Sequence, residues 1–499
     1  MEFMIEALGN VTTLSVILAM VGSTFIGVLI GALPGLNPVM AIALLLPLTY
    51  TMEPLVALAM VAGIYNGSMY GGAIPAILLR IPGTPASIAT TFDGYPMALN
   101  GHASKALKIA CWSSAIGGVM SAIALMTIGP FLARWTLLFG PAEYFWIAVF
   151  GMVAVGVLVG SDPIKGLAAA TLGLFIGLVG IDNISGQARF TFETTWLLGG
   201  FDLIVILVGL YALPPVMQLA EKADLSGLAK EALNFKNERF TIHELKNLIP
   251  TWLRSSVIGI FVGILPGAGG NIAAFLSYNA ARKASTEPET FGKGNPQGIA
   301  AAECGNNADN AASMIPALAL GIPGNVVAAL VLSALTIHGL QPGPRLFHEN
   351  PELVGGFMLE MLFTSLLIIL VGGYTATKVF SQIQRLPGVS LVPAILVLMC
   401  VGVYVINGRP IDIWIMLLAG LIGYLLEKVN VPLAPIILGM ILGPMAEAGI
   451  RRALLISRGD WTGVISNPIS MALCGATILV LLWPLITKLI KKVLTQPSN

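Results

Sequence analysis

The sequence predicts an all-α polytopic membrane protein with roughly 10–12 transmembrane helices, including broken or re-entrant helices, and two internal repeats. Apolar residues make up 56% of the 499 residues and charged residues only 10%, whereas a soluble protein carries about 25% charged residues. Apolar runs such as "FWIAVFGMVAVGVLVG" (145–160) lie within stretches near the ~20 residues that a helix needs to cross a bilayer. Two motifs also occur twice, in the same order.

The chain begins with "MEFMIEALGN", which carries two glutamates and no basic residue before the first apolar run. A cleaved signal peptide starts with a positively charged region. We therefore expect the first span to be permanent.

One charged stretch divides the chain into two halves of similar length. Residues 221–248 hold five Lys or Arg and five Asp or Glu, which is typical of an amphipathic surface helix or a linker. Because Lys and Arg favour the cytoplasmic side, we place this stretch there, and with it the tail that carries Lys488, Lys491 and Lys492. The expected organisation is a first repeat half (1–220), a cytoplasmic linker (221–250), and a second half with C-terminal scaffold helices (251–499).

The two halves repeat each other. "IGALPG" (30–35) matches "VGILPG" (262–267), and "IPAILLRIPG" (74–83) matches "IPALALGIPG" (315–324) at seven of ten positions. Such duplication is typical of secondary transporters, whose substrate site lies where the repeats meet. An odd or even number of crossings between the repeats decides whether they are inverted or parallel, and we expect the inverted arrangement.

Each repeat contains two Pro-Gly breaks followed by a residue that caps helices: Asn37, Thr84, Asn271 and Asn325. Irregular backbone at membrane depth is tolerated where protein buries it or where it lines a cavity. A helix N-terminus offers free N–H groups that suit an anion. The alternative is four ordinary interhelical turns. The predicted carboxylate-binding residues at these breaks are Gly35, Asn37, Gly83, Thr84, Gly267, Asn271, Gly324 and Asn325.

Two polar clusters precede the decapeptides, "YNGSMYGG" (65–72) and "ECGNNADN" (303–310). Short amides and carboxylates are the ligands expected for a small hard cation such as Na⁺. A solvated loop is the alternative, because two carboxylates are costly in lipid. The predicted cation-binding residues are Asn66, Tyr70, Asn306, Asp309 and Asn310.

Three further charged residues lie in apolar surroundings. Arg80 stands where the second decapeptide has Gly321, and it could pair with a substrate carboxylate or reach lipid headgroups. Asp93 could pair with Lys105 or Arg80, or cap a turn. Glu360 is an intramembrane carboxylate or an interfacial one.

Several chemistries have no motif here. The sequence lacks a G-x-x-x-x-G-K-[ST] phosphate loop, a GxSxG nucleophile elbow and an HExxH zinc motif. A formal charge of +1 without a basic tract gives no sign of nucleic-acid binding. We expect no enzyme activity and no cofactor beyond a coupling ion, Na⁺ or H⁺.

Longer motifs resemble a known family. "YGGAIPAILLRIPGTPASIATTFDGYPMALNGHASKAL" (70–107), "GILPGAGGN" (263–271) and "PALALGIPGN" (316–325) resemble the TctA family, the large membrane subunit of tripartite tricarboxylate transporters. The resemblance covers essentially the whole chain. It differs from the family pattern at Arg80, where an uncharged polar residue is more common. The matching motif positions are Gly35, Asn37, Tyr70, Gly71, Gly72, Pro82, Gly83, Thr84, Asp93, Gly94, Pro266, Gly267, Asn271, Pro323, Gly324 and Asn325.

The resemblance implies a multi-pass protein of the bacterial inner membrane that takes up citrate-like tri- and dicarboxylates with an ion gradient. It also implies two partners, a small four-span membrane subunit (TctB-like) and a periplasmic solute-binding protein (TctC-like). A homodimer is one option for the oligomeric state. The alternatives are a carboxylate or anion channel, or a member of the family that carries a different organic acid.

Overall fold

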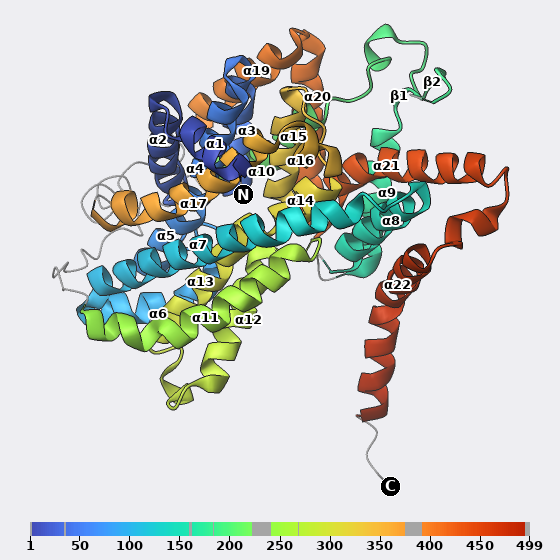
Figure 1. Cartoon of the computed structure of the whole chain (residues 1–499). Helices are drawn as coiled ribbons and strands as arrows, with labels where there is room; N and C mark the ends of the chain where they lie inside the picture. The colour runs from blue at the N-terminus through green and yellow to red at the C-terminus, as the bar shows by residue number, and fades with distance from the viewer. Residues whose placement is uncertain are drawn as a thin grey trace. The chain divides into compact units, whose positions relative to one another are not determined.

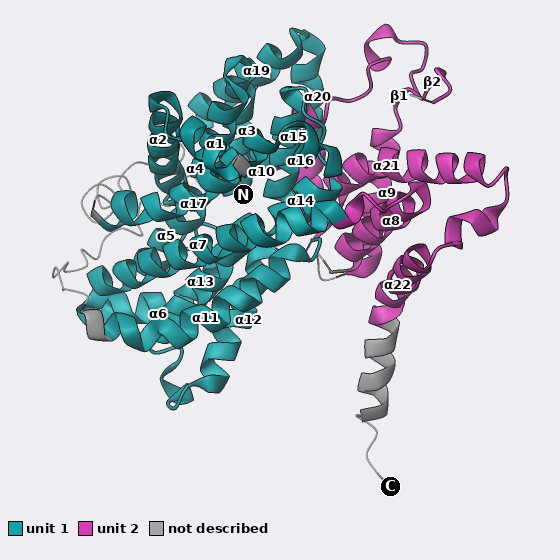
Figure 2. Ribbon diagram, viewed as in Figure 1, with its two compact units in different colours: residues 1–134, 207–421 teal, residues 135–206, 422–499 magenta. Residues whose placement is uncertain are grey.

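The computed structural model describes residues 2–33, 36–158, 162–182, 184–221, 241–267, 269–374 and 392–494. These residues are almost entirely helical, with one two-stranded antiparallel sheet, β1-β2. The chain divides into two compact units, unit 1 (1–134 and 207–421) and unit 2 (135–206 and 422–499) (Figures 1 and 2). Each unit therefore takes segments from both sides of the charged stretch at 221–250. The all-α class predicted from the sequence is confirmed.

Unit 1 contains most of the helices, and α7, α10 and α20 extend beyond its limits. Its elements are α1 (Glu2–Val11), α2 (Leu14–Gly31), α3 (Pro38–Leu45), η1 (Leu46–Thr51), α4 (Pro54–Gly71), α5 (Ala73–Leu79), η2 (Pro85–Ser87), α6 (Ile88–Met97), η3 (Ala98–His102), α7 (Ala103–Thr136), α10 (Leu203–Glu221), α11 (Ile242–Ile264), α12 (Gly269–Ala284), η6 (Pro288–Thr290), α13 (Pro296–Ala312), α14 (Met314–Leu320), α15 (Val326–Ile337), α16 (Pro344–Glu349), α17 (Pro351–Tyr374), α19 (Val392–Asn407) and α20 (Pro410–Lys428).

Unit 2 carries the sheet. Its elements are α8 (Pro141–Leu158), α9 (Pro163–Gly177), β1 (Gly180–Ile181), β2 (Ala188–Arg189), η4 (Thr195–Leu197), α21 (Ala434–Ile456), η8 (Trp461–Ile465) and α22 (Pro468–Leu494).

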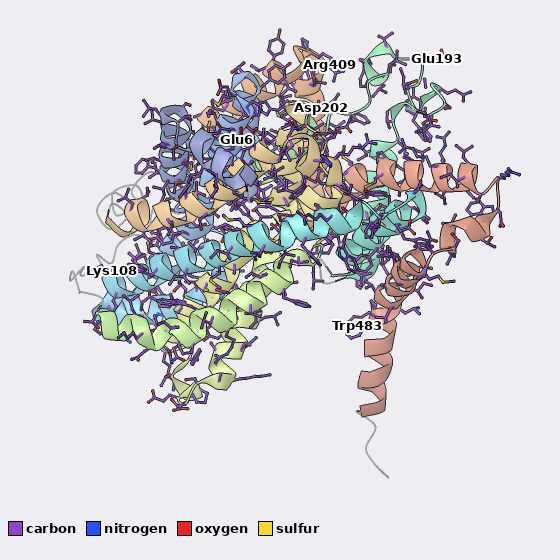
Figure 3. All side chains as sticks on the ribbon, in the orientation of Figure 1. Glu6, Lys108, Glu193, Asp202, Arg409 and Trp483 are labelled. Carbon is purple, nitrogen blue, oxygen red and sulfur yellow. The ribbon has the colours of Figure 1, made fainter. Side chains whose placement is uncertain are left out.

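The helices are suited to a bilayer. Six described segments are long and apolar enough to cross a membrane, and further apolar helices among the described residues have 10–17 residues. Many large apolar side chains on these helices are exposed, among them Leu14 (73%) and Trp483 (51%; Figure 3). A water-facing surface would not carry so many, so this is a multi-pass membrane protein.

The duplicated sequence folds into duplicated structure. In the first half a long helix, α2, is followed by a break, a shorter returning helix (α3), a second long helix (α4) and the short α5. In the second half α11, α12, α13 and α14 follow in the same order, and α11, α12 and α13 contact one another (Figure 1).

Close glycine contacts pair the two long helices in each repeat. A Cβ on Gly27 of α2 would lie 2.7 Å from the Ile64 carbonyl oxygen of α4. A Cβ on Gly31 would lie 2.3 Å from the Ser68 carbonyl oxygen. In the second repeat, the equivalent glycines of α11 contact the equivalent residues of α13. A Cβ on Gly259 or Gly263 of α11 would lie 2.4 or 2.9 Å from the carbonyl oxygen of Gly305 or Asp309 in α13. The contacts advance together along both chains, so α4 runs parallel to α2 and α13 runs parallel to α11.

Between the repeats the direction reverses. Asn66 of α4 bonds Asn310 of α13, whereas Tyr70, further along α4, lies near Glu303, earlier in α13. Helices α4 and α13 therefore cross antiparallel. Equivalent helices that cross in opposite directions are what inverted repeats produce.

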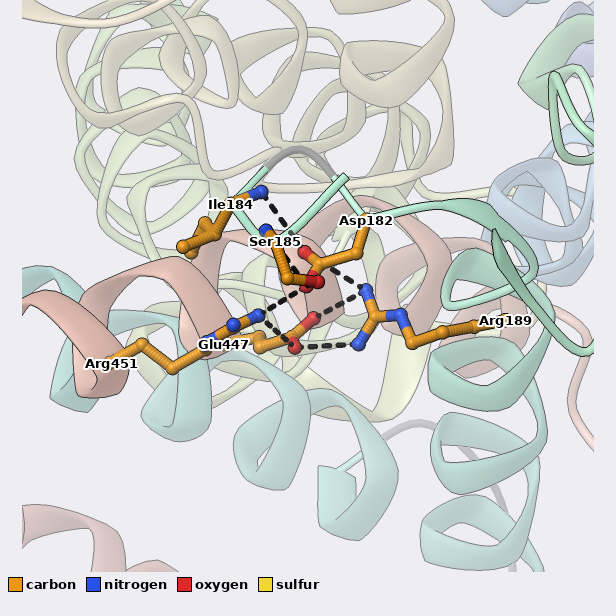
Figure 4. A network of polar contacts seen from close by, with 6 residues as sticks. All are labelled: Asp182, Ile184, Ser185, Arg189, Glu447 and Arg451. Atoms are coloured by element: carbon orange, nitrogen blue, oxygen red, sulfur yellow. Dashed lines mark hydrogen bonds and ion pairs between the residues drawn. The ribbon is translucent and has the colours of Figure 1, made fainter. Parts of the chain in front are cut away.

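A charged network in unit 2 fixes the loop between α9 and α10 to α21 (Figure 4). Arg189 Nη1 donates to Glu447 Oε1 at 2.6 Å, and Arg189 Nη2 donates to Glu447 Oε2 at 3.1 Å. Arg451 Nη1 lies 2.7 Å from Asp182 Oδ2 and 3.1 Å from Glu447 Oε1. The Ser185 hydroxyl and Arg451 donate to Asp182 and hold its pKa well below the ordinary range for Asp.

Candidate functional site between the repeats

The Pro-Gly break that ends each decapeptide has the same backbone hydrogen bond and helix end in both repeats. Gly83 N–H donates to the Gly72 carbonyl at 3.2 Å, and Gly324 N–H donates to the Ser313 carbonyl at 3.3 Å. Before each break the helix ends on a left-handed residue, Arg80 (φ 57°) in the first repeat. Its counterpart, Gly321, has φ 74°. The repeated sequence therefore forms the same backbone structure in both repeats, and the match is more than a similarity in hydrophobicity.

Three of the four expected helix caps form. Asn37 accepts a hydrogen bond from Met40 N–H at 2.8 Å at the start of α3, and Thr84 accepts from Ser87 N–H at 3.3 Å. Asn325 accepts from Ala328 N–H at 2.9 Å at the start of α15. The fourth expectation is wrong, because α12 already begins at Gly269, so Asn271 lies inside its first turn and does not cap it.

The helices that follow these breaks contact the opposite repeat. Helix α3 of the first repeat contacts α15 of the second, and α12 of the second contacts η2 of the first. Within the second repeat the two breaks are joined, since Gly267 N–H donates to the Gly324 carbonyl at 2.7 Å. Gly35, a predicted substrate residue, lies outside the described residues, as does most of the charged stretch (222–240).

The centre of the candidate site is a contact between a cap and a buried carboxylate. Asn325 Nδ2 donates to Asp309 Oδ2 at 2.8 Å and to the Tyr65 hydroxyl at 3.0 Å. Tyr65 comes from the first repeat, so this contact joins the repeats. Tyr65 is 1% and Asp309 0% exposed, so both groups lie within the protein and not in a solvated loop.

One face of α13 carries buried oxygens without protein partners. Among the described residues, Asp309 Oδ1, Asn310 Oδ1 and both polar atoms of the Asn306 side chain have no hydrogen-bond partner. The spacing 306, 309, 310 places the three side chains on one helix face. Gly270 of α12 closes this face, since a Cβ there would lie 2.4 Å from Asn306 Oδ1. An unpaired buried polar atom costs about 1–3 kcal/mol, and a bound cation is one way to satisfy several oxygens at once.

The first-repeat candidates are placed differently. The Asn66 amide nitrogen donates to Met361 O, Thr364 Oγ1 and Ser365 Oγ at 3.2, 2.8 and 3.1 Å. Its oxygen accepts from Asn310 Nδ2 at 2.9 Å. Asn66 therefore joins α4, α13 and α17 with every polar atom occupied.

Tyr70 is held apart from this face. Its hydroxyl donates to the Gly372 carbonyl of α17 at 3.4 Å, and its ring fills the space that a side chain on Gly372 would need. The structure thus brings Asn306, Asp309 and Asn310 together and leaves Tyr70 outside the group.

Two buried carboxylates were not among the predicted site residues. Glu303 of α13 accepts hydrogen bonds from the Thr90 and Ser114 hydroxyls, which belong to the first repeat. Glu360 of α17 is 0% exposed and neither of its oxygens has a hydrogen-bond partner among the described residues, so its side chain lies inside the protein. Glu303 lies in the polar run that the sequence shows, but its contacts with Thr90 and Ser114 depend on helix packing and leave no local signal.

Asp93 fixes a loop of the second repeat. Its Oδ1 accepts from the N–H groups of Gly292, Gly294 and Asn295 at 2.8, 2.9 and 2.8 Å. Its Oδ2 accepts from the Tyr278 hydroxyl at 2.9 Å. Neither suggested ion pair forms among the described residues: Lys105 pairs with Glu244, and Arg80 lies over the Tyr95 ring. The role is therefore structural.

Comparisons with known proteins identify the family and relatives of this chain. The sequence model of the "Tripartite tricarboxylate transporter TctA family" matches residues 17–438. An Agrobacterium vitis protein described as "Uncharacterized 52.8 kDa protein in TAR-I ttuC' 3'region" is 35% identical over 489 residues, 97% of this chain and 96% of that one. A second, "Uncharacterized protein in TAR-II ttuC' 3'region" from the same organism, is 36% identical over 234 residues, 47% of this chain and 96% of its own. No solved structure matches the chain.

Proposed function

This chain belongs to the tripartite tricarboxylate transporter TctA family, and we propose that it carries citrate-like tri- and dicarboxylates by ion-coupled symport. Family membership makes it a component of a transporter and not an enzyme. The finer proposal concerns the substrate, the coupling ion and the residues that bind them.

The substrate part of the proposal rests on the helix N-termini at the breaks. Helices α3 and α15 begin with Asn caps and contact each other across the repeats. Helix α12 and η2 make the second such contact. Helix N-termini favour carboxylates, because their free N–H groups and dipoles present positive charge. We propose Asn37, Gly83, Thr84, Gly267, Asn271, Gly324 and Asn325 as substrate-binding residues, with Gly35 completing the first break.

The cation part rests on the α13 face. Asp309 supplies one negative charge, and Asn306 and Asn310 supply neutral oxygens, a set that suits Na⁺. The repeats differ here, since the position equivalent to Asp309 is Ser68, whose hydroxyl bonds its own helix backbone at 2.6 Å. We therefore propose one cation site, in the second repeat, with Asn66 and Tyr70 supporting the surrounding helices.

Family membership supports the proposed location and partners of the chain. We propose the bacterial inner membrane as the location, with the segment 221–250 in the cytoplasm. A small four-span subunit and a periplasmic solute-binding protein are the proposed partners, and the binding protein delivers the carboxylate.

The observation that carries the proposal is the bond from Asn325, the cap at a repeated break, to Asp309 among unpaired oxygens. The test is uptake of radiolabelled citrate into vesicles that hold this chain and its small subunit, with purified binding protein and an imposed Na⁺ or H⁺ gradient. We expect saturable uptake that requires the binding protein and one gradient. Asp309→Asn should remove the dependence on that gradient.

Other outcomes discriminate between the alternatives. Uptake that is independent of gradient and binding protein would indicate a channel. Absence of citrate uptake, with another carboxylate bound by the binding protein, would keep the mechanism and change the substrate.

A further inference from the structure

A cleft of about 580 Å³ lies between α6 and α12 in unit 1. Two arginines, Arg80 and Arg282, line it together with Thr91 and Asn279. Small-molecule sites typically measure about 300–1,000 Å³ and combine apolar walls with a few polar groups. The aromatic residues in the walls are Phe92, Tyr95, Phe275, Tyr278 and Phe291.

Arg80 occupies a backbone position that does not favour it. Its φ of 57° and ψ of 23° are left-handed, a conformation disfavoured for residues with a Cβ. The same position in the other repeat is Gly321, which adopts this conformation without strain. A glycine would therefore satisfy the backbone here, so the backbone conformation does not explain the arginine. Its guanidinium lies 5.9 Å from the centre of the Tyr95 ring, at the cleft.

The positive charge in the cleft is not neutralised by the chain. Within the described ranges, neither Arg80 nor Arg282 forms an ion pair with a carboxylate. The carboxylate of Asp93 contacts two lining residues, Tyr278 and Gly292, and bonds with them and with the nearby loop use both of its oxygens. Two arginines thus line a space that has no acidic residue among its described lining residues.

The position of the cleft relates it to the breaks. Helix α12 begins at the break after α11, and α6 follows the break that Thr84 caps. The cleft lies further along both helices, near the end of α6, where Gly294 of the loop after α12 approaches Met97. Lys105 at the start of α7 and Glu244 at the start of α11 pair at this end, which we call the linker face.

We propose that this cleft is a second binding site for the transported carboxylate, between the central breaks and the linker face. This inference rests on the proposed function. Two guanidinium groups match a ligand with two or more carboxylates, and the aromatic walls accept its carbon skeleton. The phosphate of a lipid headgroup shares the same oxyanion chemistry, so the test separates the two sources.

The first experiment measures citrate binding by isothermal titration calorimetry to the full chain in phosphatidylcholine nanodiscs. The Asn325→Leu background removes the central site, so the cleft is measured alone. Arg80→Gly and Arg282→Gln should each weaken citrate binding about tenfold, as expected for the loss of one charged hydrogen-bonding partner. Arg80→Gly suits the left-handed backbone and should fold as well as the parent. Lys283→Gln is the matched control, since Lys283 is the next residue on α12 but lines a different cavity with Val257 and Phe261.

The results decide the proposal as follows. Citrate binding that both arginine variants weaken and Lys283→Gln leaves unchanged supports the cleft site, as does acetate binding at least tenfold more weakly than citrate. Absence of citrate binding in the Asn325→Leu background overturns it. So does loss of citrate binding when phosphatidylglycerol is added, because the cleft would then hold a lipid headgroup.

A transport measurement distinguishes this inference from the proposed function. In membrane vesicles of opposite orientation, Arg80→Gly should raise KM about tenfold for citrate presented at the linker face and leave KM at the other face within about twofold. An equal rise at both faces would place Arg80 in the central site and overturn the second site while leaving symport intact. Absence of transport by the unaltered chain would instead contradict the proposed function.

Discussion

Asn325 Nδ2 lies 2.8 Å from Asp309 Oδ2, while Asn325 Oδ1 accepts the Ala328 N–H at 2.9 Å. One side chain therefore starts α15 at a repeated break and also orients a buried carboxylate on α13. This connects the proposed anion site at the helix tips to the proposed cation site. Binding of either ligand would change the position of the Asn325 amide and so the affinity for the other ligand, which is a physical basis for coupling.

Substitution of Asn325 can separate its two roles. Asn325→Leu removes both the cap and the donor, and it should abolish uptake. The lost cap costs about 1 kcal/mol and the lost donor to buried Asp309 about 1–3 kcal/mol, so the protein should still express and fold with lower stability. Asn325→Ser keeps a capping hydroxyl but loses the amide donor to Asp309. We expect Asn325→Ser to keep the cap, to lower stability by about 1–3 kcal/mol because buried Asp309 loses its donor, and to lose most uptake. Wild-type uptake by both variants would rule out the site.

The cation site predicts an unusual combination for Asn306. Its polar atoms have no protein partner, so Asn306→Ala removes unpaired buried groups and should leave stability unchanged or raise it by up to about 1 kcal/mol in the absence of Na⁺. If Asn306 is a ligand, the same change should raise the Na⁺ concentration for half-maximal uptake about tenfold.

The control for this prediction is the neighbouring Asn307. Asn307 Nδ2 donates to the Glu303 carbonyl at 2.9 Å, and Asn307 Oδ1 lies 3.4 Å from Asn310 Nδ2. Asn307→Ala should therefore lower stability. A loss of stability at Asn306 comparable to that at Asn307, with Na⁺ dependence unchanged, would show that Asn306 is only a packing residue.

The sequence was informative where chemistry is local. Each Pro-Gly break with a following Asn or Thr predicted a helix start, and Asn37, Thr84 and Asn325 confirm it because a cap bonds its own first turn. The prediction that Asn271 caps α12 was wrong because the helix begins two residues earlier, at Gly269.

Contacts between distant segments could not be predicted from the sequence. The three acceptors that the Asn66 amide nitrogen reaches in α17 are about 300 residues away, and nothing near Asn66 indicates them. The same holds for Asp93, whose acceptor role depends on a loop about 200 residues further along. A polar residue in an apolar run therefore indicated a special position without deciding between ligand and structural support.

The charged loop of unit 2 predicts a specific pH dependence. Asp182 has a lowered pKa because the Ser185 hydroxyl, Arg451 and nearby N–H groups bind its charged form. A lowered carboxylate pKa stabilises the folded loop above the ordinary Asp value of about 3.9, and this contribution is lost as pH falls through the folded pKa. We expect hydrogen exchange at 184–190, corrected for intrinsic rates, to be slow near pH 5 and to accelerate below about pH 3.9.

Asp182→Asn gives the comparison for this loop. The amide cannot ionise, so the variant should exchange faster near pH 5 and show little of the acid-dependent change. Loop protection that is insensitive to acid in the unaltered chain would mean that the bonds from Ser185 and Arg451 do not hold the loop.

Two glycines of α2 should respond in opposite ways to the same substitution. A Cβ on Gly31 would lie 2.3 Å from the Ser68 carbonyl oxygen, so Gly31→Ala must separate α2 from α4 and should destabilise unit 1 by about 1–3 kcal/mol. Gly22 has no heavy atom within 4 Å of its would-be Cβ, so Gly22→Ala should stabilise α2 by about 0.5–1 kcal/mol. Thermal unfolding of both variants in one detergent measures the difference. Equal effects would contradict the close parallel packing of α2 and α4, and with it the equivalence of this pair to α11 and α13.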